Sequence, residues 1–140
     1  MIHLSTERGI SKEALLEFYS AKQIKKYENR DDALYEAVVK SDYLVTAWDG
    51  HRLVGIIRSS GDHIFTQYIN NILIHDDYLT KGIGSKMMDM YLEETREVMD
   101  LYMMSGRKVA KAFTINWFEY RGFKRVAEVE GFQVFHKKQG

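Results

Sequence analysis

The sequence contains no cysteine and no proline among its 140 residues, and its 20 basic side chains are balanced by 20 acidic ones. Without cysteine the chain cannot form a disulfide framework, a zinc–thiolate site or an iron–sulfur cluster, and it has no thiol nucleophile. Without proline, no X-Pro isomerisation can slow its folding. The zero net charge disfavours a nucleic acid as the main partner, because such proteins usually carry a basic excess.

Long hydrophobic runs are also missing. No stretch approaches the roughly 20 apolar residues that a membrane helix needs, and residues 1–7 lack the basic and apolar regions of a signal peptide. We therefore predict a cytoplasmic protein with no membrane partner. Apolar residues make up 45% of the chain, enough for one core, and the length predicts a single domain over residues 1–140. The five histidines show no ligand spacing, so we predict no metal site.

Strand-forming residues occur in seven short runs. Asp49-Gly50 separates two of them and predicts a hairpin, because glycine tolerates positive φ in a tight turn. A second turn is predicted at Ser59-Ser60-Gly61-Asp62. The predicted strands are 2–4, 43–48, 53–57, 64–74, 101–104, 126–129 and 132–136.

Four segments show helical spacing. Ser11 is placed to cap the first helix, and Asp31 or Asp32 the second, because these side chains accept free amides of the first turn. A third helix is predicted over 83–98 and a fourth over 108–120, ended by Gly122 in a left-handed conformation. The order β-α-α-β-β-β-α-β-α-β-β predicts a mixed α/β fold whose mostly antiparallel sheet contains at least one parallel crossover.

The most informative local feature is the turn Gly82-Ile83-Gly84-Ser85, which follows a strand and begins a helix. Two glycines let the backbone approach a ligand closely, and free N–H groups with a positive dipole end form an anion site. Lys81 and Lys86 add positive charge, which suits a pyrophosphate. The dinucleotide fingerprint fails because Met87 stands where a small residue is required, and the P-loop spacing fails as well. The alternative is a glycine-rich helix start that binds nothing.

Two motifs in this context resemble those of the GNAT superfamily of acyl-CoA-dependent N-acetyltransferases. Residues 72–85 (ILIHDDYLTKGIGS) resemble its acyl-CoA-binding motif: a hydrophobic strand end, then Arg or Gln, two spacers, Gly, one spacer, and Gly or Ala. Residues 117–123 (WFEYRGF) resemble the segment at the end of its last helix. The order of elements matches along nearly the whole chain. The resemblance implies a mixed sheet of about six to seven strands flanked by about four helices, with a splayed central pair.

The resemblance also implies where the co-substrate acetyl-CoA binds. Its pantetheine arm would bond the free backbone near Leu73 and Ile74, where an N–H would also stabilise the oxyanion. Its pyrophosphate would be held by amides at Thr80, Lys81, Gly82, Ile83, Gly84 and Ser85. Asn116 is a further candidate contact, although a buried Asn satisfied by the backbone is the alternative that we favour. The acceptor amine would enter from the side of the first two helices and the hairpin.

The chain departs from the family pattern at Asp76, Leu79 and Phe118. The family commonly has proline at the first position and Arg or Gln at the second. With Asp76 in place of proline, other contacts must fix the approach to the cofactor site. Leu79 removes a charge from the expected phosphate contact. Phe118 stands where a tyrosine normally protonates the departing thiolate, and phenylalanine has no proton to give.

The family pattern therefore does not identify the general acid or the general base of this chain. Tyr102 on the neighbouring strand is the candidate acid, with a core or cleft aromatic as the alternative. No carboxylate lies on the long strand before His75, so Asp62 and His75 are the candidate bases, each with a purely structural alternative in a turn or loop.

From these residues we predict an acetyl-CoA-dependent N-acetyltransferase. It would transfer an acetyl group directly, in a ternary complex, to a primary amine of a small molecule or peptide. The alternative is a non-catalytic acyl-CoA sensor of the same fold. Many relatives form dimers, but nothing in this sequence specifies one.

Overall fold

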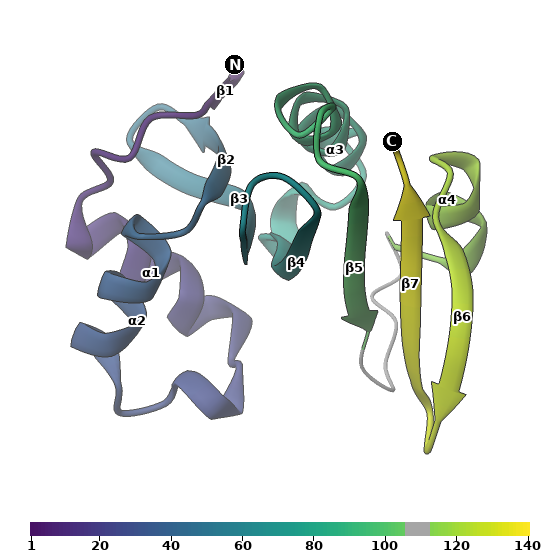
Figure 1. The fold of residues 1–140 in the computed structure, drawn as a ribbon. Coiled ribbons are helices and arrows are strands. Elements are labelled where there is room, and N and C mark those ends of the chain that lie inside the picture. The colour runs from purple at the N-terminus through teal and green to yellow at the C-terminus, as the bar shows by residue number, and fades with distance from the viewer. Residues whose placement is uncertain (106–112) are drawn as a thin grey trace.

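The strands of the computed structural model, which describes residues 1–105 and 113–140, form one seven-stranded sheet in the order β1-β2-β3-β4-β5-β7-β6 (Figure 1). Every neighbouring pair is antiparallel except β4 and β5, which run parallel. The mixed, mostly antiparallel sheet is as predicted. The strands are β1 (Ile2–Ser5), β2 (Tyr43–Asp49), β3 (Arg52–Gly61), β4 (Thr66–Ile74), β5 (Asp100–Ser105), β6 (Lys124–Val129) and β7 (Phe132–Lys138).

The described helices lie on both faces of this sheet, in the predicted order along the chain (Figure 1). Two core clusters define the faces. One cluster joins α1 (Lys12–Lys22) and α2 (Asp31–Val39) to β2 and β3, and the other joins α3 (Ile83–Glu94) and α4 (Ile115–Tyr120) to the sheet. Two short 3₁₀ turns, η1 (Lys25–Tyr27) and η2 (Asp76–Tyr78), complete the set.

Local capping explains where the first helix begins but not the second. The Ser11 hydroxyl accepts the Ala14 amide at 3.1 Å, as predicted. The cap predicted at Asp31 or Asp32 is wrong, because α2 begins at Asp31 and Arg30 occupies the N-cap. Both carboxylates therefore lie in the first turn, where they still face the positive end of the helix dipole.

The third helix ends earlier than predicted. It stops at Glu94 instead of continuing to Val98: the Thr95 amide still donates to the Tyr91 carbonyl at 2.9 Å, but the amides of Arg96 and Val98 turn to the carbonyls of Glu93 and Thr95, three residues back. Val98 is nevertheless buried, as its place on the apolar face suggested.

The two hairpins differ in how well their sequence specifies them. The Asp49-Gly50 turn forms as predicted, with φ of +59° at Gly50. The turn predicted at 59–62 is wrong: β3 continues to Gly61, and β4 begins at Thr66 instead of 64. The turn lies over residues 62–65 because the Asp62 carboxylate gathers the amides of Ile64, Phe65 and Thr66.

Residues 108–112 of the fourth predicted helix, and Gly106 before them, lie outside the described residues. Within the described part the helix begins at Ile115, not at Phe113, because the Thr114 hydroxyl caps it by accepting the Trp117 amide at 3.2 Å. Gly122 follows with φ of +89°, as predicted for the end of this helix.

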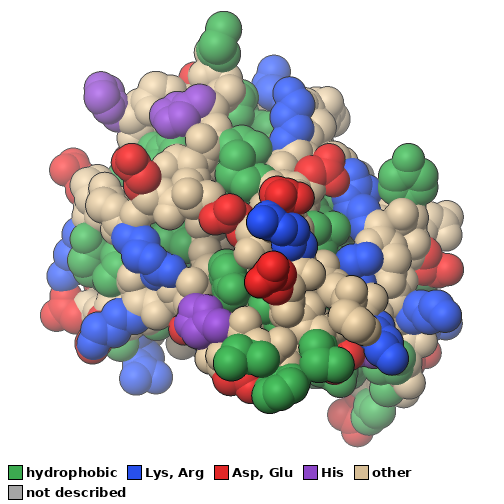
Figure 2. Space-filling view, turned by 45° about the horizontal axis from the view of Figure 1, so that its top comes forward, with side chains coloured by type: hydrophobic (Ala, Val, Ile, Leu, Met, Phe, Trp, Pro, Cys, Tyr) green, Lys and Arg blue, Asp and Glu red, His purple; other side chains and the backbone are tan. Residues whose placement is uncertain are grey.

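The surface carries charges of both signs. On the face drawn in Figure 2, acidic and basic side chains are interspersed, and neither sign forms a continuous patch. None of the helices in the described ranges is long and apolar enough to cross a membrane.

Candidate active site

A cleft opens where the parallel strands separate. Within the described residues, the pairing of β4 with β5 ends at Ile69 and Met103, while β4 continues beside β3 as far as Ile74. This is the splayed pair that the resemblance implies. The cleft has a volume of about 220 Å³ and is lined by residues 69–73 of β4, by residues 103–105 of β5, and by Phe113 and Phe118.

A β-bulge marks the point of separation. Arg58 pairs with Asn71 and Ser59 with Ile69, so Asn70 is the extra residue on β4. A bulge reverses the alternation of side chains along a strand. Ile69 therefore faces the α3 side, whereas Asn71 faces the α1 side, where it contacts Tyr19 at 2.9 Å.

The backbone of β4 beyond the bulge offers free polar groups. The His75 amide donates to the Val54 carbonyl at 2.8 Å, and Gly55 lies opposite Ile74. In an antiparallel ladder the hydrogen-bonding direction alternates, so Leu73 points its polar groups toward β3, and Ile72 and Ile74 point theirs toward the cleft side. The sequence predicted a backbone contact at Leu73 and Ile74 and missed Ile72. The direction of the Ile72 backbone groups depends on the strand register.

The N-terminus of α3 has no side-chain cap. Gly82 occupies the N-cap with φ of +71°. The amides of residues 83–85 therefore keep no intrahelical partner and point out of the helix end. Lys81 and Lys86 beside them are exposed. The arrangement fits the pyrophosphate of a CoA thioester.

The two glycines of this turn have different roles. A Cβ at Gly82 would meet open space, so glycine is needed there for its positive φ. A Cβ at Gly84 would lie 2.8 Å from Phe113 Cε1 and 3.0 Å from Ile74 Cδ1. The expectation that both glycines serve ligand approach therefore needs correction, since Gly84 lets α3 pack closely on the core.

Side chains around the turn hold it to its neighbours. The Trp117 indole donates to the Ser85 hydroxyl at 3.2 Å, and the Arg121 guanidinium lies 4.4 Å from the centre of the Trp117 ring. Leu79 packs against the core near α3. Asn116 is exposed on α4, so the alternative of a buried, backbone-satisfied Asn is wrong.

The loop before the turn is fixed without proline. The Lys22 ammonium donates to the Asp76 carboxylate at 2.9 Å and to the Ile74 carbonyl at 2.7 Å. The hydrogen bond and the charge of Lys22 lower the pKa of Asp76. The Tyr78 hydroxyl donates to Asp49 at 2.6 Å. These contacts fix the loop at Asp76, the position where the family commonly has proline.

Phe118 closes the cleft from the α4 side. It is 1% exposed and its ring stacks on Phe135 with centroids 4.5 Å apart. It therefore forms part of both the core and the cleft wall.

Tyr102 lies next to the point where the strands separate. It pairs with Tyr68 one residue before the last rung of the parallel ladder. Its ring stacks on His136 with centroids 4.8 Å apart, and His136 is in turn 2.7 Å from Asp100. The phenol ring is thus held in a fixed orientation next to the end of the ladder, although Tyr102 is not among the residues that line the cleft.

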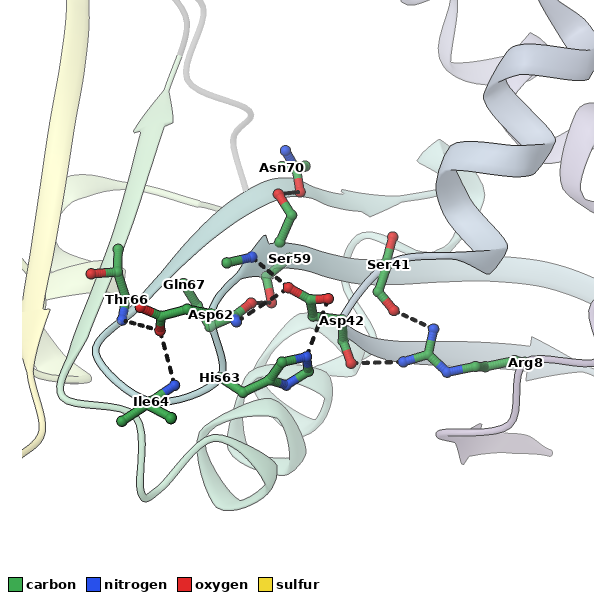
Figure 3. Close-up of polar contacts among 12 residues, drawn as sticks. Arg8, Ser41, Asp42, Ser59, Asp62, His63, Ile64, Thr66, Gln67 and Asn70 are labelled. Carbon is green, nitrogen blue, oxygen red and sulfur yellow. Dashed lines mark hydrogen bonds and ion pairs between the residues drawn. The ribbon is translucent and has the colours of Figure 1, made fainter.

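Asp62 lies in the β3–β4 turn, with its carboxylate directed back into that turn (Figure 3). One oxygen accepts the amides of Ile64, Phe65 and Thr66 at 2.9, 2.8 and 3.1 Å, and these bonds lower the pKa of Asp62. Thr66 itself lies about 13 Å along β4 from Asn70, at about 3.3 Å per residue. The structure therefore does not bring Asp62 to the cleft.

Asp62→Ala is expected to weaken the fold at neutral pH, because three turn amides lose their acceptor. The folded-state pKa of Asp62 is below its unfolded value, so its charge-dependent stabilisation is present above about pH 4 and is lost as the pH falls through the folded pKa. The melting temperature difference from wild type should be constant between pH 7 and about pH 5 and shrink below about pH 4. Glu97→Ala, also exposed, is the control; equal melting temperatures for both variants at pH 7 would contradict this role.

A second polar cluster supports the same turn (Figure 3). The Asp42 carboxylate accepts the Gly61 amide and lies 3.2 Å from the His63 ring nitrogen. His63 has φ of +68°, so the turn holds it in the left-handed region. These contacts fix the start of β4.

His75 lies directly after β4. Its Nδ1 accepts the Asp77 amide at 3.1 Å, and its Nε2 is 2.9 Å from an Arg52 guanidinium nitrogen. Both ring nitrogens thus face partners in the chain, which gives His75 a structural role in holding η2.

Sequence reasoning missed a buried polar cluster on the α1 side of β4. The Arg58 guanidinium, 8% exposed, donates from Nε to Asn71 Oδ1 at 2.6 Å and from Nη2 to the Tyr27 hydroxyl at 3.1 Å. Tyr19 completes the cluster through Asn71. A signal was present, since Arg58 interrupts an otherwise apolar strand and Tyr27 is the aromatic residue of a polar segment.

Comparison with known proteins agrees with this geometry. The family model "Acetyltransferase (GNAT) domain" matches residues 9–134. Similar solved structures include a GNAT family acetyltransferase from Streptococcus pneumoniae (23% identity, 90% of this chain and 89% of the other, TM-score 0.74). Others are an aminoglycoside 6'-acetyltransferase type Ii (16%, 99% and 97%, 0.81) and a paia N-acetyltransferase from Thermoplasma acidophilum in complex with coenzyme A (13%, 99% and 99%, 0.70). None of the curated proteins compared is a significant sequence match.

Because the family model covers most of its length, the chain belongs to the GNAT acetyltransferase family. The general activity of this family is acyl-CoA-dependent acetyl transfer. Among residues 1–105 and 113–140, no group of three or more His, Asp or Glu side chains is arranged to hold a metal ion.

Proposed function

We propose that the protein is an acetyl-CoA-dependent N-acetyltransferase acting on a primary amine of a small molecule or peptide by direct transfer in a ternary complex. The observation that carries this proposal is the coincidence of two features: a cleft opens where β4 leaves β5, and the uncapped N-terminus of α3 follows that strand. One feature suits a pantetheine arm and the other a pyrophosphate.

When bound, acetyl-CoA supplies the activated acetyl group as a thioester. The outward amides of residues 83–85, with Lys81, would hold its phosphates, and Thr80, Leu79 and Asn116 are further candidate contacts. The backbone of Ile72 and the amide of Ile74, on either side of Leu73, are directed to the cleft side, and the Ile72 N–H would stabilise an oxyanion. Phe118 excludes water from the α4 side. We propose Tyr102, whose ring stacks on His136 one residue before the parallel ladder ends, as the donor of a proton to the leaving thiolate.

Acetyl-CoA binding tests the first part of this proposal. Titration calorimetry at millimolar acetyl-CoA should show heat, and the ligand should raise the melting temperature. Lys81→Glu is expected to weaken binding several-fold, and the loss should shrink at high salt because an exposed charge is screened. Lys138→Glu has the same charge change on an exposed residue and should bind as wild type does. If wild type gave no heat and no melting shift with acetyl-CoA, the proposal would be contradicted.

A non-catalytic acyl-CoA sensor is the second candidate, favoured by Phe118 at the position where a proton donor is expected. Thiol release from acetyl-CoA with polyamines, amino acids, aminoglycosides and peptides separates the two. Turnover above about 0.1 per second with any of these acceptors would exclude the sensor, since typical enzymes reach about 1–10³ per second. Tyr102→Phe is expected to slow that turnover, and an unchanged rate would remove its proposed role.

A further inference from the structure

A second cavity is formed by the N-terminal helices. It has a volume of about 640 Å³ and lies between α1 and the segment that leads into α2. Three carboxylates line it, those of Glu17, Glu28 and Asp31, and no lysine or arginine is among the described residues that line it. Such a pocket favours a cationic guest, and a primary amine is protonated near neutral pH.

The pocket and the cleft share one wall. Tyr19 and Tyr27 line the pocket, whereas Asn71 lines the cleft. Asn71 Nδ2 donates to the Tyr27 hydroxyl at 3.2 Å, and the Tyr19 hydroxyl donates to Asn71 Oδ1 at 2.9 Å. A group bound in the pocket against Tyr27 is thus one side chain away from the place where the strands separate.

In this shared wall, one more hydrogen-bond donor approaches Asn71 Oδ1 than that oxygen can accept. Asn71 Oδ1 has two lone pairs, yet Arg58 Nε, the Tyr19 hydroxyl and the Tyr27 hydroxyl approach it at 2.6, 2.9 and 3.3 Å. The Tyr27 contact is the longest of the three. The Tyr27 oxygen meanwhile accepts two donors, Arg58 Nη2 and Asn71 Nδ2. Removing the Tyr27 proton would leave every remaining donor with an acceptor.

The charge of Arg58 also favours an ionised Tyr27. Within the described residues no carboxylate pairs with this buried guanidinium, which donates to the neutral oxygens of Asn71 and Tyr27. A buried cation without a counter-ion is costly. An ionised Tyr27 would supply the missing negative charge.

We propose that Tyr27 takes a proton from the ammonium group of an acceptor bound in the pocket between α1 and α2, with Arg58 and Asn71 as positioning residues. This inference rests on the proposed N-acetyltransferase function and names the base that the sequence left open. It assigns a cationic amine as the substrate class.

The proton balance of the step is complete. The ammonium group gives one proton to the Tyr27 oxygen and becomes a neutral amine. The amine lone pair then forms the C–N bond to the acetyl carbon, the C–S bond breaks, and its electron pair leaves on sulfur. Tyr102 gives its proton to the thiolate and is reprotonated by the second nitrogen proton, so the products are an amide and a free thiol, and Tyr27 returns its proton to solvent.

The charged groups around Tyr27 support its ionisation. Burial works to raise its pKa, but the hydrogen bond to Asn71 and the charge of Arg58 outweigh burial and lower it, and Lys26, 5.2 Å from the ring centre, acts in the same direction. Burial raises the pKa of Tyr19, which therefore stays a neutral donor. The carboxylates of Glu17, Glu28 and Asp31 also face the pocket and oppose ionisation until a cation occupies it.

A phenolate titration tests the proposal without any acceptor. Phenolate absorbance near 295 nm is followed against pH for wild type, Tyr27→Phe, Arg58→Met and the control Tyr120→Phe, whose tyrosine is 86% exposed. We expect the earliest ionisation step to disappear in Tyr27→Phe, to move to higher pH in Arg58→Met and to persist in Tyr120→Phe. An earliest step that persists in Tyr27→Phe would overturn the proposal, whatever the enzyme acetylates.

The kinetic arm uses an amine that wild type acetylates in the thiol-release assay. Tyr27→Phe should lower kcat/KM about 10²-fold or more at neutral pH, the scale of general base catalysis, and leave acetyl-CoA binding unchanged. Its remaining activity should rise with pH until the free amine predominates, so the loss should shrink at high pH. A loss that is constant across pH, or no loss, would overturn the catalytic role. Failure of wild type with every amine would contradict the proposed function instead, because the titration is independent of turnover.

Discussion

Gly61→Ala is expected to destabilise the protein by roughly 1–3 kcal/mol, within the range for overpacked sites. A Cβ at Gly61 would lie 2.1 Å from the Thr66 carbonyl oxygen and 2.9 Å from Gln67 Nε2. The first of these atoms belongs to the backbone and cannot rotate away, so the β3–β4 hairpin must open. Chemical unfolding by urea measures the loss.

The matched control is Gly9→Ala. A Cβ there meets nothing within 4 Å, and Gly9 is not among the glycines with positive φ. We expect a change within about 0.5 kcal/mol, because alanine also reduces the entropy of the unfolded chain. Equal stability of the two variants would show that the close approach of Gly61 to Thr66 does not constrain the hairpin.

The same hairpin positions the cleft. The Asp62 and Asp42 clusters fix the first residue of β4, and the bulge at Asn70 follows four residues later. A displaced start to β4 would move the bulge relative to β5. Gly61→Ala should therefore also reduce the thermal shift produced by acetyl-CoA, whereas Gly9→Ala should retain it.

Phe118→Ala is expected to have the largest effect on stability, about 3–5 kcal/mol, the usual range for a fully buried phenylalanine. Phe118 is 1% exposed, stacks on Phe135 and meets Phe123 edge to face at 5.9 Å. The helix that carries it, α4, has six residues and is too short to be stable without this packing. The loss should appear in urea unfolding, and the acetyl-CoA thermal shift should fall because the cleft loses one wall.

Tyr120→Ala on the same helix is the control for Phe118→Ala. Its side chain is 86% exposed, so we expect a change within about 0.5 kcal/mol. A loss in Tyr120→Ala as large as that in Phe118→Ala would mean that helix propensity, not the buried aromatic cluster, holds α4 in place.

The sequence predicted the fold well because its strongest signals are local. Asp49-Gly50 forms its hairpin and Gly122 follows α4 with positive φ, as single residues with special backbone conformations dictate. The glycine turn before α3 was also predicted, and Gly82 has the left-handed conformation of an uncapped helix start. The boundaries differ from those predicted, since the side chains of Asp62 and Thr114 bind backbone amides and thereby set the starts of β4 and α4.

The sequence by itself determined the family and the order of elements, because each depends on residues that are neighbours along the chain. The tertiary structure decided the rest. Which β4 backbone groups face the cleft depends on register and on the bulge at Asn70, and the reason for Gly84 is Phe113, 29 positions away. The cluster of Tyr27, Arg58 and Asn71 comes from three separate elements. Its chemistry exists only when packing removes these groups from water, and no local pattern specifies that.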